Sequence, residues 1–371
     1  MGYLSTVGHM QHLAILESPD PDAAGARLRL GGEIGTALQE ATADPARMLP
    51  LWTVFSRGEP VPAPDLRRAV SDRFVAEAVR RELLVGVDVG DDEPWLRGAI
   101  CIVAADVAGE LLWVASDFPW YDHDAVSVTG PGEASATLLA AVPQAEHRRI
   151  LDMGCGSGAI GVHLAAPGRT LVSSDVNPRA LALTELTAAL NGRDVQTVRS
   201  DFADRIGGRF DLVLCNPPFI LGRPFGQTTF RDCIDGSGHA ALARDLAPLL
   251  SAGGLALYLT NWEYPLGGPD PLERLGSELT TLDRCDVLVL ERAVVPVEEY
   301  ARVWSDDADE QQQWVDAFRR RDVGHIGTGV VAVHRSDAEE RNVTVLRDYD
   351  TPRDLLNSVI ADWAVTGISQ R

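Results

Sequence analysis

The sequence predicts an α/β protein built around a mostly parallel β-sheet that carries helices on both faces. From Leu111 onward, short apolar runs alternate with amphipathic helical segments, which is the pattern of consecutive strand–helix–strand units. A glycine-rich turn follows one of these runs, and polar residues stand at the ends of the runs after it. These observations predict a sheet whose strand ends hold a ligand.

Residues 11–110 are expected to form an N-terminal module of helices followed by a β-hairpin. Ser71 is the predicted N-cap of a helix whose apolar residues recur at intervals of three and four. Leu84–Val89 and Arg97–Ala105 flank an acidic turn at Asp91–Glu93 and predict the hairpin. Helices followed by a hairpin resemble a winged helix, but the acidic turn favours a packing or lid module over a reader of duplex DNA.

The sheet domain is assigned to residues 111–336, with a helical insertion at 296–326 that contains a predicted helix around Gln311–Arg320. A C-terminal extension, 337–371, follows it and contains a predicted helix at Pro352–Ala364. Residues 1–10 are interpreted as a tag remnant and left out of the fold prediction. The candidate strands are Leu111–Ser116, Arg149–Met153, Thr170–Asp175, Val195–Ser200, Phe210–Cys215, Leu255–Thr260, Asp286–Glu291 and Thr328–His334.

The composition argues against several classes of protein. The 371 residues include 33 basic and 54 acidic side chains, and the net charge of −21 opposes a large nucleic-acid footprint. No apolar run reaches the roughly 18–20 residues that span a bilayer. The five cysteines are scattered and odd in number, which fits a reducing cytoplasm and predicts neither a disulfide framework nor a metal site.

The segment Leu151–Gly158 leaves a strand and enters a helix. Gly154 and Gly156 permit a tight turn and close approach of a ligand, and Gly158 lets the helix start against the strand. By itself this is an ambiguous nucleotide signature, because Gly154, Gly156 and Ala159 also match the dinucleotide-binding spacing.

Carboxylates follow the next two predicted strands. Asp175 can accept two hydrogen bonds from a ribose diol, and it is also placed to cap the helix that starts at Pro178. Asp201 ends the third run with Phe202 beside it. An acceptor next to an aromatic face suits an adenine ring, although a plain loop aspartate is the alternative.

The run Phe210–Cys215 ends directly in Asn216-Pro217-Pro218-Phe219. Two prolines stop the strand and fix the backbone, so the amide oxygen of Asn216 and the carbonyl of Pro217 point in set directions. Together they can accept both N–H groups of a planar nitrogen and tilt its lone pair toward a methyl donor. Phe219 can stack on the flat group. The simpler alternative is a strand terminator.

In this order, the glycine turn, the two aspartates and the Asn-Pro-Pro-Phe motif resemble class I S-adenosylmethionine (SAM)-dependent methyltransferases. The subgroup with this asparagine motif contains release-factor glutamine N5-methyltransferases and ribosomal-RNA guanine-N2 methyltransferases. The resemblance rests on Leu151–Ile220 and implies a seven-stranded Rossmann-like sheet whose last strand is antiparallel. It implies that the glycine turn holds the methionine part of SAM, Asp175 the ribose and Asp201 the adenine. The implied cofactor residues are Asp152, Gly154, Cys155, Gly156, Gly158, Asp175, Asn177, Asp201 and Phe202, and the implied catalytic residues are Asn216, Pro217, Pro218 and Phe219.

Two further segments are expected to face the ligands. Val128–Ser135 contains a glycine turn before a predicted helix and can close over the methionine end of the cofactor, or it is an ordinary helix entry. Asn261–Tyr264 ends the fifth apolar strand, counted from Arg149–Met153, and is placed to face the cleft. No dedicated general base is evident, and Asp235 and His239 are the candidates for a proton relay.

The expected function is that of a cytoplasmic SAM-dependent N-methyltransferase acting on a planar nitrogen of a protein or small molecule. Because the sulfonium is already activated, positioning alone can supply roughly 7–11 kcal/mol of barrier reduction. Three alternatives stay open: an RNA or DNA base methyltransferase, an NAD-dependent oxidoreductase, and a binding protein that keeps the pocket without turnover. Neither the acceptor nor the oligomeric state follows from the sequence.

Overall fold

The computed structural model describes residues 21–90, 92–119, 127–217, 219–221, 232–233, 238–336 and 342–366. The predicted tag remnant, Pro218, Asp235 and the side chain of His239 lie outside the described part. The chain divides into two compact units, one comprising Met1–Gly132 and Cys155–Asp201, the other Glu133–Gly154 and Phe202–Arg371. No helix among the described residues is long and apolar enough to cross a membrane.

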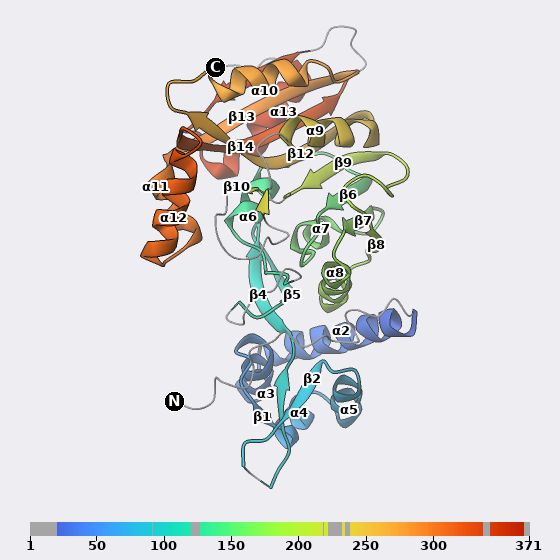
Figure 1. Cartoon of the computed structure of the whole chain (residues 1–371). Helices are drawn as coiled ribbons and strands as arrows, with labels where there is room; N and C mark the ends of the chain where they lie inside the picture. The colour runs from blue at the N-terminus through green and yellow to red at the C-terminus, as the bar shows by residue number, and fades with distance from the viewer. Residues whose placement is uncertain are drawn as a thin grey trace. The chain divides into compact units, whose positions relative to one another are not determined.

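The central sheet has eight strands in the order β15-β13-β14-β12-β9-β6-β7-β8 (Figure 1). Strand β14 runs antiparallel to both of its neighbours, whereas the other pairs of defined register are parallel. The predicted α/β sheet with one antiparallel strand is therefore confirmed, and β15 extends it at one edge. The bounds are β6 (Arg149–Met153), β7 (Thr170–Asp175), β8 (Gln196–Arg199), β9 (Phe210–Cys215), β12 (Leu250–Pro265), β13 (Cys285–Pro296), β14 (Val323–Arg335) and β15 (Val343–Arg347).

The N-terminal module has the element order and strand pairing of a winged helix, with a three-stranded sheet in the order β1-β3-β2. The predicted cap is present, because the Ser71 hydroxyl accepts a hydrogen bond from the Phe74 N–H at 3.1 Å. The elements are α2 (Pro21–Ala41), α3 (Pro45–Leu51), a π-helical turn (Trp52–Ser56), β1 (Val61–Pro62), α4 (Ala63–Ala69), α5 (Asp72–Arg80), β2 (Leu84–Val87) and β3 (Trp95–Gly98).

Two predicted strands do not lie where the sequence placed them. Arg97–Ala105 is not one hairpin arm, because β3 ends at Gly98 and a new strand, β4 (Cys101–Val107), begins. Strand β4 pairs only with β5 (Glu110–Ser116), so the run at 111–116 belongs to a separate hairpin and not to the parallel sheet. Side chains of helix α8 (Pro178–Leu190) and of its C-cap Asn191 satisfy the β5 backbone: the Ala115 N–H donates to the Thr187 hydroxyl at 3.0 Å, and Trp113 exchanges two hydrogen bonds with Asn191.

Within the first unit, α2 and α8 cross at a glycine contact. A Cβ atom at Gly35 would lie 2.1 Å from the Leu190 carbonyl oxygen, and one at Gly31 would lie 2.7 Å from the Ala189 Cβ. Only glycine permits this approach. The buried side chains of α2 and α8 consequently belong to one hydrophobic core, which the N-terminal module shares with the helix that follows β7.

Within the second unit, two helices form the insertion between β13 and β14: α11 (Val297–Trp304) and α12 (Ala308–Arg319). The sequence predicted α12 and missed α11. Tyr300, Trp314 and Phe318 of this pair pack with Ile220 and Leu221 of the short strand β10 (Ile220–Leu221) in a separate apolar cluster.

The remaining α-helices of the described chain are α6 (Glu133–Ala140), α7 (Ala159–Leu164), α9 (Gly238–Leu246), α10 (Pro271–Leu279) and α13 (Leu356–Thr366).

Candidate functional site

The backbone of the glycine turn, residues 154–158, favours glycine at three of its five positions. Gly154, Gly156 and Gly158 have φ values of +71°, +54° and +79°. A Cβ at Gly158 would lie 2.9 Å from three atoms of Thr184, so a side chain there would clash with α8. At Gly154 and Gly156 the nearest described atom is 4.0 Å from the Cβ position, so no described atom crowds either position.

Asp175 lies next to the glycine turn at the carboxyl end of β7. Its two carboxylate oxygens accept hydrogen bonds from the N–H groups of Gly156 at 3.1 Å and Asn177 at 2.9 Å. Burial raises the pKa of the Asp175 carboxyl, and the N–H groups of Asn177, Gly156 and Val176 partly oppose that shift. The N-cap of α8 is Asn177, whose side chain accepts from the Arg179 N–H at 3.0 Å. Asp175 therefore keeps lone pairs for a ligand and does not cap the helix.

The side chain of Thr184 fixes the turn from the side of α8. Its hydroxyl contacts the Gly156 carbonyl oxygen at 3.1 Å and the Cys155 sulfur at 3.2 Å. Cys155 is buried in the turn, and Asp152, one of the predicted cofactor residues, is 1% exposed within β6. Sequence reasoning did not single out Thr184, because its role depends on the close approach of α8 to the turn.

Asp201 and Phe202 follow β8, which is a parallel neighbour of β7 in the sheet. The Ser200 N–H donates to the Asp175 carbonyl oxygen at 3.1 Å, which brings the chain before Asp201 beside Asp175. Phe202 adopts a φ of +39° and is 40% exposed. A positive φ is unfavourable for a bulky aromatic residue, and such strained residues cluster at ligand sites.

A buried ion pair holds the segment upstream of the glycine turn. Arg179 and Asp117 are 3% and 4% exposed, and the Arg179 Nε lies 3.0 Å from both carboxylate oxygens. Asp117 also accepts a hydrogen bond from the Val128 N–H at 2.7 Å. A Val128 methyl group lies 4.0 Å from the Cβ position of Gly156, so the first residue of the predicted closing segment borders the turn.

In the second unit, the chain leaves β9 at Asn216, and we refer to Asn216, Pro217 and Phe219 as the acceptor corner. Strands β6 and β9 are parallel neighbours, and the Asn216 carbonyl oxygen lies 4.0 Å from the Cβ position of Gly154. The three residues of the corner are half-buried. The carboxyl ends of β6 and β9 thus bring the start of the glycine turn next to the acceptor corner, as the sequence predicted.

The amide oxygen of Asn216 is the most informative atom of the corner. It is buried, and it has no hydrogen-bond partner among the residues that the structure describes. Leaving a buried amide oxygen unpaired costs about 1–3 kcal/mol, and few such atoms occur in native proteins. A ligand that donates an N–H or O–H group would satisfy it.

The backbone after the corner is held by two side chains from elsewhere in the second unit. The Asn261 amide donates to the Phe219 carbonyl oxygen at 3.0 Å, and the Tyr300 hydroxyl accepts from the Leu221 N–H at 2.9 Å. The Trp304 ring lies against Phe219, with ring centroids 6.1 Å apart. Asn261 was predicted to face the ligands, whereas Tyr300 and Trp304 were not.

A signal for these two aromatic residues was present in the sequence. Val297, Tyr300, Ala301 and Trp304 follow Pro296 at helical spacing, and the first three are buried. The period identifies the buried face of a short helix, but it does not reveal which strand end that face contacts.

The rest of the segment 261–264 turns away from the acceptor corner. Trp262 lies against Gly327 and Gly329 of β14, where a Cβ would approach the indole within 2.0 and 2.7 Å. Its N–H donates to the fully buried Glu291 at 2.7 Å, and the Tyr264 hydroxyl donates to the same carboxylate at 2.5 Å. The expectation that this whole segment faces the cleft was therefore wrong for Trp262 and Tyr264, because successive strand residues point to opposite faces.

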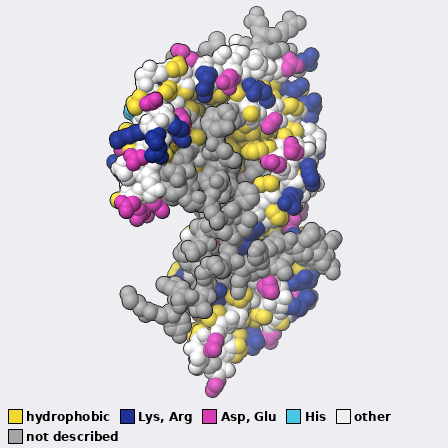
Figure 2. All heavy atoms as spheres, viewed as in Figure 1, with side chains coloured by type: hydrophobic (Ala, Val, Ile, Leu, Met, Phe, Trp, Pro, Cys, Tyr) yellow, Lys and Arg dark blue, Asp and Glu magenta, His cyan; other side chains and the backbone are white. Residues whose placement is uncertain are grey.

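Arginines near the wing of the N-terminal module are paired with an acidic side chain. Arg80 and Arg81 of α5 both pair with Glu77, and Asp92 and Glu93 stand on the wing. In Figure 2, arginine and acidic side chains are interspersed over the coloured part of the face that is drawn. Among the described residues, no group of three or more His, Cys, Asp or Glu side chains could hold a metal ion.

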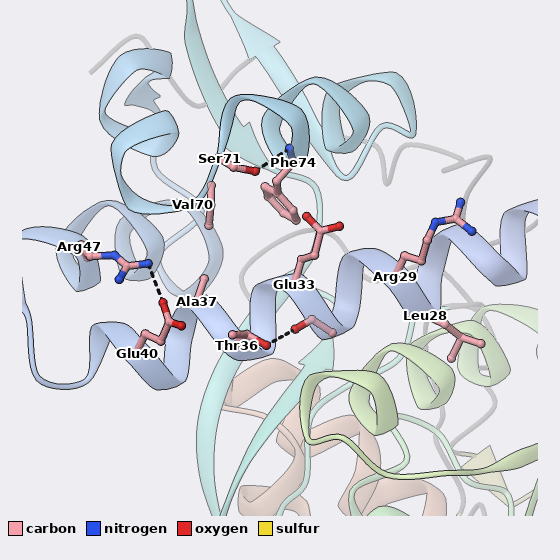
Figure 3. A pocket seen from close by; sticks show the side chains of 11 residues that line it. Leu28, Arg29, Glu33, Thr36, Ala37, Glu40, Arg47, Val70, Ser71 and Phe74 are labelled. Carbon is pink, nitrogen blue, oxygen red and sulfur yellow. Dashed lines mark hydrogen bonds and ion pairs between the residues drawn. The ribbon is translucent and has the colours of Figure 1, made fainter.

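A groove of about 620 Å³ lies in the N-terminal module, between α2 and the start of α5 (Figure 3). Its charged side chains are of both signs, and Arg47 pairs with Glu40 across it. None of the predicted site residues lines it, so it is separate from the chemistry described above. The lining residues are Leu28, Arg29, Gly32, Glu33, Thr36, Ala37, Glu40, Arg47, Val70, Ser71 and Phe74.

Comparison with known proteins agrees with the resemblance stated above. Residues 122–243 match the model of the methyltransferase small domain. A ribosomal RNA small subunit methyltransferase C of Pasteurella multocida is 36% identical over 87 residues, which are 23% of this chain and 26% of the relative. A release factor glutamine methyltransferase of Lactococcus lactis is 31% identical over 128 residues, 34% of this chain and 45% of the relative.

The chain thus spans less than half of each of these relatives. Among solved structures, a T. thermophilus 16S rRNA N2 methyltransferase in complex with AdoMet and guanosine shares 18% identity, with 58% of each chain covered and a TM-score of 0.35. A likeness of that size adds nothing about the site. The matched residues 122–243 include the glycine turn, Asp175, Asp201 and the acceptor corner.

Proposed function

We propose that this chain, whose residues 122–243 carry a methyltransferase small domain, is a SAM-dependent N-methyltransferase. Its acceptor is a planar amine or amide nitrogen on a protein or a small molecule, and the reaction takes place in the cytoplasm. The observation that carries the proposal is the buried amide oxygen of Asn216, which has no partner among the described residues. An acceptor N–H group would supply that partner.

The residues around the glycine turn fit the cofactor. The uncrowded Cβ positions of Gly154 and Gly156 are the proposed place of the methionine part, and the carboxylate oxygens of Asp175 can accept the two ribose hydroxyls. Asp201 and the exposed ring of Phe202 are the proposed adenine contacts. SAM itself supplies the activated methyl group. The residues of the chain bind the cofactor and orient it.

At the acceptor corner, the proposed chemistry is positioning and charge stabilisation. The Asn216 oxygen and the Pro217 carbonyl accept the N–H groups of the planar nitrogen, and Phe219 packs against the flat group. As the nitrogen attacks, it gains positive charge, which two fixed oxygen atoms stabilise. Because the corner is braced by Asn261 and Tyr300, these oxygens need not reorganise during the reaction.

The relatives leave two acceptor classes to compare, since their names include both release factor glutamine and ribosomal RNA methyltransferases. The net charge of −21 and the acidic wing favour a protein or small-molecule acceptor over a nucleic-acid base. The alternative of an NAD-dependent oxidoreductase gains no support, since it assigns no function to the residues of the acceptor corner.

The experiment is incubation of the protein with methyl-labelled SAM and a fractionated bacterial lysate, separated into protein, RNA and small molecules. Label in the protein or small-molecule fraction is expected, and the Asn216→Ala variant should lose it. Label confined to RNA would replace the proposed acceptor by a base. If calorimetry detects no binding of SAM or of its demethylated product, S-adenosylhomocysteine, and no fraction is labelled, the proposed function is wrong.

A further inference from the structure

Trp304, the last residue of α11, lies beside the acceptor corner. Its indole N–H is buried and has no hydrogen-bond partner among the described residues, although the residue as a whole is half-buried. Native proteins rarely leave a buried donor unpaired, so such a group calls for an explanation. The position of the ring offers one, because it lies 6.1 Å from Phe219 of the acceptor corner and is tilted by 60° against it.

At and beside the acceptor corner, two buried polar atoms of opposite character lack a partner among the residues that the structure describes. Asn216 offers an oxygen that needs a donor, and Trp304 offers an N–H that needs an acceptor. Phe219 connects them, since it follows Asn216 in the motif and contacts the Trp304 ring. A planar group that carries both an N–H and a lone-pair oxygen has the donor and the acceptor that these two atoms lack.

The insertion holds Trp304 rigidly relative to this neighbourhood. Tyr300, one helical turn earlier, is 3% exposed, and its ring meets the Trp304 ring edge-on at 6.1 Å. The Tyr300 hydroxyl accepts from the Leu221 N–H, two residues after Phe219. The same helix turn thus fixes both the indole and the backbone that leaves the corner, and little ordering remains for the moment of binding.

We propose that Trp304 is a specificity-determining residue that donates its indole N–H to an oxygen on the planar group of the methyl acceptor. The inference rests on the proposed function, because it assumes that the acceptor nitrogen binds at Asn216. It goes beyond that function by assigning a substrate contact to the helical insertion α11–α12. A group with an N–H and no neighbouring oxygen would leave the indole unpaired and bind less well.

Two small probes isolate the oxygen. Benzamide and aniline are both flat and uncharged at neutral pH and carry an NH₂ group, but only benzamide carries an oxygen beside it. Each is titrated into the full chain saturated with S-adenosylhomocysteine, and the indole N–H resonances are followed by ¹H–¹⁵N NMR. Trp304→Phe keeps an aromatic ring, removes the donor and assigns the Trp304 signal. Trp363→Phe is the matched control, because the Trp363 N–H is also buried without a partner in the described part of the chain, but its ring lies against His334.

Benzamide is expected to shift the Trp304 resonance and to bind about tenfold more weakly to Trp304→Phe, as befits one lost hydrogen bond. Aniline should bind both proteins equally, and Trp363→Phe should behave as the unaltered chain. The inference is wrong if benzamide leaves the Trp304 resonance unmoved, or if the substitution weakens both probes by the same factor. Calorimetric binding of S-adenosylhomocysteine in the same samples separates this outcome from failure of the proposed function, which predicts that the nucleoside binds in every variant.

Discussion

The glycine turn and the acceptor corner differ in how completely the chain satisfies their polar groups. Around the turn, Asp175 accepts two backbone N–H groups, Asn177 caps α8, and the Thr184 hydroxyl contacts the Gly156 carbonyl. At the corner, the Asn216 oxygen stays buried without a described partner. These groups of the turn are paired within the chain even without a ligand, whereas the Asn216 oxygen of the corner is left for a ligand to satisfy.

The difference predicts that substitutions in the two regions affect different steps. The largest effect is expected for Asn216→Ala, which should lower methyl transfer by about 10²–10³-fold, as does the loss of one charge-stabilising hydrogen-bonding group in other enzymes. SAM affinity should change less than about twofold. Label transfer and calorimetry measure the two quantities. Asn357→Ala, a substitution in α13, serves as the control, and unaltered turnover in Asn216→Ala would remove the corner from the mechanism.

Asp175→Ala should show the opposite pattern. Loss of a charged acceptor for two ribose hydroxyls is expected to weaken SAM binding by about 100-fold, while turnover at saturating SAM stays close to normal. Calorimetry gives the affinity, and transfer at saturating cofactor gives the turnover. Equal losses in both would mean that the two regions do not act on separate steps.

Gly158→Ala tests how strictly the turn is preformed. The alanine would combine a positive φ with a contact of 2.9 Å to Thr184, so the free energy of unfolding should fall by about 2–4 kcal/mol. Gly168→Ala is the matched control, because φ is +82° there and nothing lies within 4 Å of the Cβ position. That variant should lose only about 1–2 kcal/mol in denaturant unfolding. Equal losses in the two variants would show that the contact with α8 is unimportant.

The smallest effect concerns pH. Burial raises the pKa of Asp175, so the folded protein holds that proton more tightly than the unfolded chain does. This carboxyl therefore stabilises the fold at low pH, and that contribution is lost as the pH rises through its folded pKa. Ribose hydroxyls bind the ionised form, so SAM affinity should fall by about tenfold per pH unit below that pKa. Calorimetry across the acid range should show proton release on binding, and Asp175→Ala should abolish it.

The sequence predicted the strand end at which each of the two regions lies. Strands β7 and β9 have the predicted bounds, and the residues at their ends, Asp175 and Asn216, lie where expected. Both strands are largely buried, so their apolar runs start and stop where the strands do. Chemistry that follows a buried parallel strand can be located from the sequence, because the strand end fixes its position at one edge of the sheet.

Features that depend on contacts between distant segments were not predicted. The run at 111–116 has the composition of a sheet strand, but α8 side chains satisfy its backbone and β4 is its partner. Strand β15 was missed because its residues are mostly half-exposed and polar residues interrupt the run. The Trp304 N–H, which has no partner within the described ranges, has no sequence signal at all, since its surroundings depend on how the folded chain packs around the ring.

The glycine crossing of α2 and α8 limits how this chain can be rearranged. Gly35 lies so close to the backbone of Leu190 that α2 can carry no side chain at this position. The N-terminal module and the helix after β7 therefore have to change together. An exchange of the module between related chains would succeed only if the matching surface of α8 were transplanted with it, which makes the pair, and not the module alone, the unit that can be recombined.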